Sequence, residues 1–307
     1  IAVGSQAMGL GITTGNYNTA IGYQSGYDLT SGANNIFQGF QAGFNATTGS
    51  TNIALGYQAI STGVLTGTEN IAIGRAAGQD LTSGIRNFFA GYGAGTNATT
   101  ADYSIGIGQS ALGLGVLTGD HNIAFGNGAG YDLTSGSHNI LSGFQAGANI
   151  TTGNGNIFQG QEAGEFATTA NYGIAIGYEA IGTGVMTGTD NTAIGRIAGH
   201  DLTSGAYNNF IGYFAGANAT TAINTIAIGR QAISLGVLTG TDNTAIGYLA
   251  GDDLTSGAYN VFTGHRAGAN ATTGDNNVGI GRYALGTGVL TGSDNTAIGY
   301  GAGQDLT

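Results

Sequence analysis

Tyrosine and arginine recur at one position of a repeated phrase, and they are the side chains here best suited to bind a ligand. The phrase "NTAIGYQSG" at 18–26 returns as "NTAIGRIAG" at 191–199, with looser copies between. If the copies stack about 4.8 Å apart, the residue after the first glycine forms a surface column. Such a column could grip a glycan or a receptor. It could instead be simply a stacking and cation–π ladder, which is the interpretation we favour. The column comprises Tyr23, Phe40, Tyr57, Arg75, Tyr92, Phe144, Tyr178, Arg196, Tyr213, Arg230, Tyr248, His265, Arg282 and Tyr300.

Carboxylates recur in two kinds of turn, where they could supply oxygen ligands to calcium. The chain contains no Gly-Gly pair, so a GGxGxD calcium array is absent. We therefore favour solvated turn carboxylates and expect no cofactor, with calcium as the alternative. The "DLT" turns carry Asp28, Asp80, Asp132, Asp201, Asp253 and Asp305, and the "VLTG" turns carry Glu69, Asp190, Asp242 and Asp294.

A third recurring group matches the N-glycosylation acceptor pattern, as "NATT" or "NITT". The alternative is ordinary turn chemistry, which applies if the source is a phage or a typical bacterium and is weaker for an archaeal surface protein. The asparagines are Asn45, Asn97, Asn149, Asn218 and Asn270.

Catalytic signatures are lacking, and we expect no enzyme. The histidines, His121, His138, His200 and His265, fall in separate repeats, and no Gly-x-Ser-x-Gly elbow occurs. The net charge is −11 and the six basic residues are scattered arginines, which argues against nucleic acid. No run of about 18 apolar residues is present, so we expect no membrane insertion.

The elements that carry these residues are short repeats. Counted from the turn residue before each phrase, 17 complete copies follow one another at steps of 17 or 18 residues. With 61 glycines but 41% hydrophobic residues, the chain is too apolar for a disordered linker. Repeats this short predict a solenoid, in which each unit buries its faces by stacking on its neighbours.

Three repeat types alternate to give a 52-residue period, visible in Leu29, Leu81 and Leu133 and again from Leu202. Between Leu133 and Leu202 an extra repeat, at 153–169, is inserted whole. A fold that accepts a unit without losing phase is an open solenoid. We expect one repeat domain over 1–307, cut from a longer fibre because both ends fall within a phrase.

The "xAIG" segment of each repeat reads as a strand. Its outer residues, such as Ile71 and Ile73, face one way, and its middle residue, such as Ala72, faces the other. In six repeats the middle residue is large: Phe37, Phe89, Leu141, Phe158, Phe210 and Phe262. Because both faces are apolar, one fills the coil and the other needs a partner. The simplest partner is another copy, as a homotrimer.

The glycine that ends the phrase occurs in all 17 copies, which predicts a positive φ or a close backbone approach. Asparagine follows the turn residue by three in 14 copies. The three exceptions, Ser104, Gly173 and Thr225, are the copies whose turn residue is alanine. The asparagine is therefore expected to bond backbone that a glycine turn exposes. Representative pairs are Asn18 and Gly22, Asn70 and Gly74, Asn191 and Gly195, Asn243 and Gly247, and Asn295 and Gly299.

These phrases resemble the "SVAIGxxA" head repeats of trimeric autotransporter adhesins (YadA-like) and the "NTAIGYQAL…TTG" arrays of phage tail fibres. The resemblance implies a left-handed parallel β-roll, three chains intertwined about one axis, and display outside the cell. This chain departs from the adhesin heads in its longer repeats, and it carries no neck, stalk, anchor or chaperone segment.

The sequence thus predicts an all-β, parallel β-solenoid in a homotrimeric fibre. We expect the fibre to be the shaft of a virion appendage or surface adhesin that mediates attachment to a host glycan or protein receptor. The alternative is a self-assembling extracellular filament. Ice binding is disfavoured because the threonines adjoin one another at turns. A hexapeptide-type enzyme is disfavoured because the aliphatic-glycine signal comes once per repeat.

Overall fold

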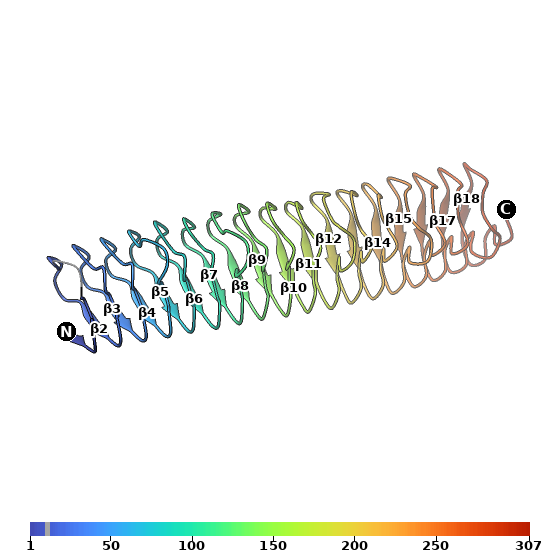
Figure 1. Ribbon diagram of the computed structural model, residues 1–307. Helices are drawn as coiled ribbons and strands as arrows, with labels where there is room; N and C mark the ends of the chain where they lie inside the picture. The colour runs from blue at the N-terminus through green and yellow to red at the C-terminus, as the bar shows by residue number, and fades with distance from the viewer. Residues whose placement is uncertain (10–12) are drawn as a thin grey trace. The chain divides into compact units, whose positions relative to one another are not determined.

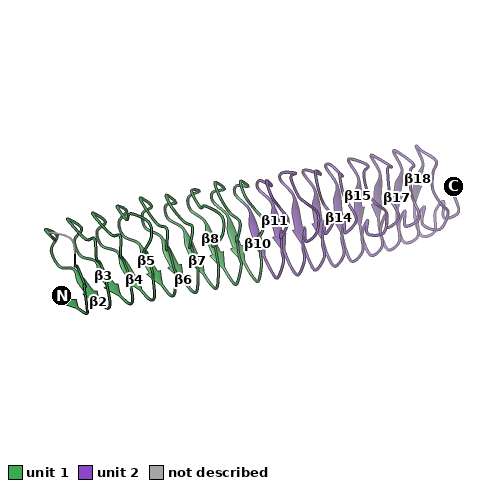
Figure 2. Ribbon diagram, in the orientation of Figure 1, with its two compact units in different colours: residues 1–155 green, residues 156–307 purple. Residues whose placement is uncertain are grey.

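The protein is built of stacked coils, each contributing one short strand. The computed structural model describes residues 1–9 and 13–307, which form two compact units, 1–155 and 156–307 (Figure 2). Each unit is a parallel β-solenoid with 17 or 18 residues per coil (Figure 1). The predicted all-β solenoid is therefore confirmed. No helix able to span a membrane occurs in the described residues.

The strands are two or three residues long and pair in parallel within each unit. In β4 and β5, for example, Ala54 lies opposite Ala72. Unit 1 contains β1 (Ala2–Val3), β2 (Thr19–Ile21), β3 (Ile36–Gln38), β4 (Ile53–Leu55), β5 (Ile71–Ile73), β6 (Phe88–Ala90), β7 (Ile105–Ile107), β8 (Ile123–Phe125) and β9 (Ile140–Ser142). Unit 2 contains β10 (Ile157–Gln159), β11 (Ile174–Ile176), β12 (Thr192–Ile194), β13 (Asn209–Ile211), β14 (Ile226–Ile228), β15 (Thr244–Ile246), β16 (Val261–Thr263), β17 (Val278–Ile280) and β18 (Thr296–Ile298).

The middle residue of each three-residue strand points into the coil. Phe37 and Ala54 are 0% exposed, while Ile36 on the outer side is 43% exposed. This alternation, expected from the sequence, follows from the two-residue period of a strand. The outer apolar residues remain partly open to solvent in the single chain.

In two of the three repeat types, the large interior side chain is exchanged between two positions of the coil. A Cβ on Gly43 would lie 2.6 Å from the ring of Phe37, so the large strand residue needs glycine there. In the next coil the strand residue is Ala54, and the position equivalent to Gly43 is Ile60, which is fully buried. Close packing explains the exchange, because a coil of fixed size tolerates neither a void nor an excess methylene.

A third interior row lies beside the turns. It is fully buried and mostly leucine, and alanine occupies it in other coils. Its larger members are Leu29, Leu65, Leu81, Leu117, Leu133, Ile150, Met186, Leu202, Leu238, Leu254 and Leu290.

The glycine after each three-residue strand has a positive φ. Close backbone approach accompanies it in coils such as that of Gly74, although Gly299 in the last coil has no atom within 4 Å of a Cβ position. Gly74 has φ +129°, and a Cβ there would lie 2.5 Å from the carbonyl oxygen of Gly91 in the next coil. Any other residue would strain the backbone and separate the coils at this point.

Removing a large interior ring should destabilise unit 2. We expect Phe210→Ala to cost about 3–5 kcal/mol, since neighbouring Ala193 and Ala227 cannot fill the void. The urea midpoint followed by circular dichroism measures the loss. Tyr207→Ala, at a ring 57% exposed, is the matched control. Equal midpoints for the two variants would contradict this description of the core.

Candidate functional site

The tyrosine and arginine column lies outside the coil, directly after the strand-ending glycines. In unit 1 the rings of Tyr23 and Phe40 stack at 5.3 Å, and those of Phe40 and Tyr57 at 4.9 Å. The guanidinium of Arg75 then sits 5.5 Å from the ring centroids of both Tyr57 and Tyr92. The column is thus a continuous stacking and cation–π ladder over these coils.

Unit 2 repeats the arrangement with different residues. Arg196 lies 5.6 Å from the ring of Tyr178 and 5.7 Å from that of Tyr213. Arg230 lies 5.8 Å from Tyr213 and 5.5 Å from Tyr248. Further along, the ring centroids of His265 and Tyr248 lie 5.2 Å apart.

The last members of the column form a similar group. Arg282 lies 5.9 Å from the ring of Tyr300. The rings remain partly exposed, Tyr92 at 54% and Tyr300 at 76%. Ligand binding by the column remains a prediction.

A second column, two residues after the strand-ending glycine, begins as a glutamine ladder. Gln24 Nε2 donates to Gln6 Oε1, Gln41 Nε2 to Gln24 Oε1, and Gln58 Nε2 to Gln41 Oε1, each at 2.9 Å. The next residue of the column is Ala76, which has no amide to donate. The ladder therefore ends with the carbonyl oxygen of Gln58.

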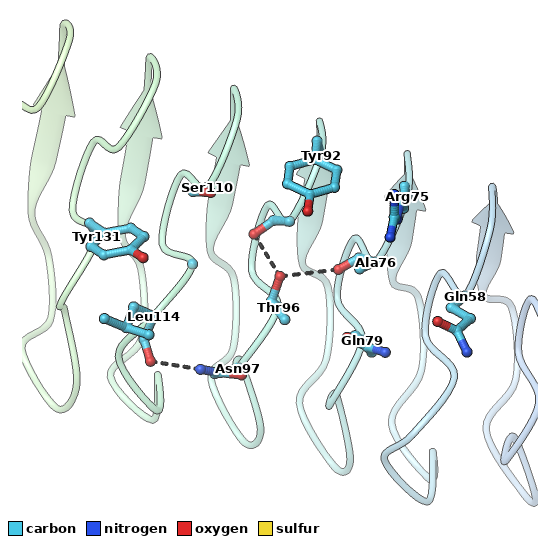
Figure 3. Close-up of a pocket in the computed structure, with 12 residues that line it drawn as sticks. Gln58, Arg75, Ala76, Gln79, Tyr92, Thr96, Asn97, Ser110, Leu114 and Tyr131 are labelled. Carbon is cyan, nitrogen blue, oxygen red and sulfur yellow. Dashed lines mark hydrogen bonds between the residues drawn. The ribbon is translucent and has the colours of Figure 1, made fainter.

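Beyond Gln58 the loss of side chains opens a groove in unit 1. Residues 76, 93 and 110 of the column are alanine, glycine and serine. The resulting hollow has a volume of about 350 Å³ (Figure 3). Its lining comprises Gln58, Arg75, Ala76, Gln79, Tyr92, Gly93, Thr96, Asn97, Ser110, Gly113, Leu114 and Tyr131.

Hydrogen bonds fix part of the groove wall. Thr96 Oγ1 donates to Gly93 O at 2.8 Å, with Ala76 O at 3.2 Å. Asn97 Nδ2 donates to Leu114 O at 2.7 Å (Figure 3). This groove was not predicted from the sequence. Its only sequence signal was that small residues at 76, 93 and 110 follow the glutamines at 24, 41 and 58 in this column.

The sequon asparagines use their side-chain nitrogen within the stack. Besides Asn97, Asn45 Nδ2 donates to Thr62 O at 2.9 Å and Asn270 Nδ2 to Thr287 O at 2.9 Å. Asn218 Nδ2 donates to Leu235 O at 3.1 Å, and Asn149 is half-buried. In these four asparagines the atom that would carry a glycan bridges neighbouring coils, which supports the turn interpretation.

The turn asparagines form a buried ladder of their own. Asn70 Nδ2 donates to Gly84 O at 2.8 Å, in the turn of the next coil. Its Oδ1 accepts the backbone N–H of Asn87 at 3.0 Å. The same pattern runs from Asn191 to Gly205 and Asn208, and from Asn243 to Gly257 and Asn260. Asn18 and Asn295 belong to the same row, with Asn295 N–H donating to Asn277 Oδ1.

The link between glycine turns and asparagine has a steric cause. A Cβ on Gly49 would lie 3.0 Å from Asn52 Nδ2 and 2.6 Å from Gly67 O. A methyl at the turn therefore crowds both the amide and the next turn. Where the turn is Ala101, the residue three later is Ser104, so the crowded amide is absent.

The turn aspartates differ in whether the preceding coil places a threonine hydroxyl against the carboxylate. Asp201 accepts a hydrogen bond from Thr183 at 2.7 Å, and Asp305 accepts one from Thr287 at 2.9 Å. Asp80 is bonded by Thr62. At the position equivalent to these threonines, Asp132 has Leu114, and burial raises the pKa of this carboxyl.

Titratable groups elsewhere pair rather than cluster. His200 Nδ1 lies 2.8 Å from Asp201 Oδ1 and its Nε2 3.6 Å from Glu179 Oε2. The rings of His121 and His138 stack at 5.0 Å. Over residues 1–9 and 13–307, no group of three or more histidine, aspartate or glutamate side chains is placed to hold a metal ion.

Comparison with known proteins adds no family to this description. No protein-family model matches the chain, and no curated protein sequence matches it. The adhesin or tail-fibre identity implied by the phrase therefore remains a prediction.

Breaking the asparagine ladder should destabilise the fold. Asn208→Ala removes the donors to Asn191 Oδ1 and Ala222 O and the acceptor for Thr225 N–H, all buried. With about 1–3 kcal/mol for each buried group left unpaired, we expect a loss of roughly 3 kcal/mol or more. The urea midpoint is compared with that of Thr221→Ala, at an exposed turn. A loss no larger than the control's would show that the ladder is dispensable.

The pKa of Asp132 offers a pH test. A raised pKa means that folded Asp132 binds its proton more tightly, so its stabilising contribution is complete below the ordinary value of 3.8 and is lost as the pH rises through the folded value. Leu114→Thr supplies a hydroxyl where Thr183 bonds Asp201, and we expect the pKa of Asp132 to fall. Carboxyl carbon NMR measures the titration. An unchanged or higher pKa would contradict the assignment.

Proposed function

We propose that this chain is the shaft of an extracellular fibre, assembled as a homotrimer, that mediates attachment. The observation that carries the proposal is the apolar outer face of the strands. Large side chains at the first and third strand positions stand partly exposed in the single chain, including Ile36 at 43%, Ile73 at 41%, Phe125 at 47% and Ile280 at 40%. Contiguous apolar surface of this kind marks an interface in soluble proteins.

Every three-residue strand contributes at least one large apolar residue to the outer face. In unit 1 the outer apolar residues are Ile21, Ile36, Ile53, Leu55, Ile71, Ile73, Phe88, Ile105, Ile107, Ile123, Phe125 and Ile140. In unit 2 they are Ile157, Ile174, Ile176, Ile194, Ile211, Ile226, Ile228, Ile246, Val261, Val278, Ile280 and Ile298. One or two such residues per coil give a stripe along the stack, with polar or small residues such as Gln38 and Asn209 at the remaining outer positions.

A second copy of the chain is the partner that best fits this stripe. Identical coils present their outer residues at the same spacing, so the rows of two copies can pack in register throughout each unit. Closed symmetry then buries one equivalent stripe per copy around a shared axis. Completing the burial of a half-exposed isoleucine contributes on the order of 1 kcal/mol, and the stripe repeats that gain at each coil.

Coil-to-coil bonding suits the chain to a mechanical role. Strand-ending glycines donate across coils, as Gly74 N–H does to Leu55 O at 2.8 Å, and asparagine and glutamine ladders run alongside. The resemblance to adhesin heads and tail-fibre arrays supports display on a virion or cell surface. A self-assembling extracellular filament is the alternative.

Charge on the outer face should dissociate the assembly. We expect a native mass of three times 30.4 kDa for the wild type by light scattering. Ile73→Asp combined with Ile228→Asp should reduce it to a single chain, because carboxylates cannot be buried on the shared axis. Val64→Asp, at a turn valine 56% exposed, should leave the trimer intact.

The masses separate the candidate functions. A wild-type mass of one chain would refute the trimer. A mass that grows with protein concentration beyond three chains would favour the filament.

A further inference from the structure

We infer that the groove of unit 1 binds a neutral oligosaccharide through its aromatic and amide side chains. This inference adds a ligand class to the attachment role proposed above. It depends on that role in one respect, that the groove is displayed outside the cell. The groove lies on the arc after the strand, lined by residues from Gln58 to Tyr131, and not on the isoleucine stripe. A trimer formed through that stripe would therefore leave the groove open.

The aromatic residues give the groove flat apolar surfaces with polar tips. Tyr92 is 54% exposed, and Arg75 against its ring holds it in place. Tyr131 is half-buried and stands further along the lining (Figure 3). Tyrosine rings offer an apolar face to the C–H groups of a sugar ring and a hydroxyl to its oxygens.

The polar groups supply both donors and acceptors at the groove. The glutamine ladder ends there, so Gln58 Oε1 meets no amide donor at position 76. Asn97 Nδ2 donates to Leu114 O, which leaves Asn97 Oδ1 as an acceptor. Gln79 and Ser110 add an amide and a hydroxyl to the lining. Sugar hydroxyls both donate and accept, and this mixture matches them.

The charge around the groove favours a neutral ligand. Its lining contains no carboxylate, and its single cation, Arg75, is engaged by two tyrosine rings. The protein as a whole has a net charge of −11, which repels anionic oligosaccharides. Neither a strong anion site nor a cation site is built here.

The dimensions favour a segment of a chain over a single compact ligand. The volume of about 350 Å³ lies at the lower end of the range for small-molecule sites. The lining runs from the coil of β4 to that of β8, which at ~4.8 Å per strand spacing is about 19 Å. An elongated open groove suits one or two sugar rings of a longer oligosaccharide.

The chain itself provides a variant that fills the groove. Gly93 has φ +65°, and Gln24, Gln41 and Gln58 adopt the same backbone region at this column. A Cβ on Gly93 would meet Thr96 Oγ1 at 3.2 Å and otherwise ordinary contacts. Gly93→Gln should therefore fold while occupying the floor of the groove. Gly301→Gln, at the same column in unit 2, is the matched control.

Saturation-transfer NMR on the full chain tests the inference, with maltotriose, cellotriose and tri-N-acetylchitotriose as neutral probes and 3′-sialyllactose as the acidic one. We expect at least one neutral probe to bind, with affinity reduced tenfold or more in Gly93→Gln and unchanged in Gly301→Gln. The inference is overturned if no neutral probe binds, if only the acidic probe binds, or if Gly93→Gln binds as the wild type does. Native mass, measured on the same samples, reports separately on the trimer.

Discussion

The structure depends on one constraint, that each coil must lie at strand spacing on the next so that their backbones can bond. The strand-ending glycines meet this constraint most directly, since a Cβ on Gly74 would strike the carbonyl oxygen of Gly91. The turn asparagines meet it at the other end of the strand, where Asn70 joins its coil to Gly84. The amino-acid type is therefore constrained at positions where the backbones of neighbouring coils touch. At other positions of the repeat it can vary.

Sequence variation between repeats is then confined to positions whose side chains point into the coil or out to its surface. Inside, Phe37 with Gly43 and Ala54 with Ile60 fill the same space in two ways, and in the third repeat type Phe89 and Ile60 of the neighbouring coils reach over Gly78. Outside, the columns diverge into a π ladder, an amide ladder and a groove. Because the backbone scaffold is constant, loss of side chains at Ala76 and Gly93 produces a hollow without disturbing the coils around it.

The periodic features were predictable from the sequence because stacking imposes them on every copy: the strands, the buried middle residue and the glycine at Gly22 and its equivalents. The groove was not predictable, since it arises in a column whose residue type varies from coil to coil, and its walls come from five coils. The left-handed backbone at Gln58 and Ile60 was also missed, because neither residue type signals it. The apolar outer face of the strands was expected from the sequence. The structure is of a single chain, so the partner that covers this face is a proposal.

A density map of the native assembly would show which face of the chain forms the interface between copies. We expect three copies in which outer strand residues, such as Ile73, pack against the same residues of the other copies around a common axis. The tyrosine and arginine column and the groove at Tyr92 would then lie on the outside. A map in which these residues face solvent, or in which copies meet through the groove, would contradict this arrangement.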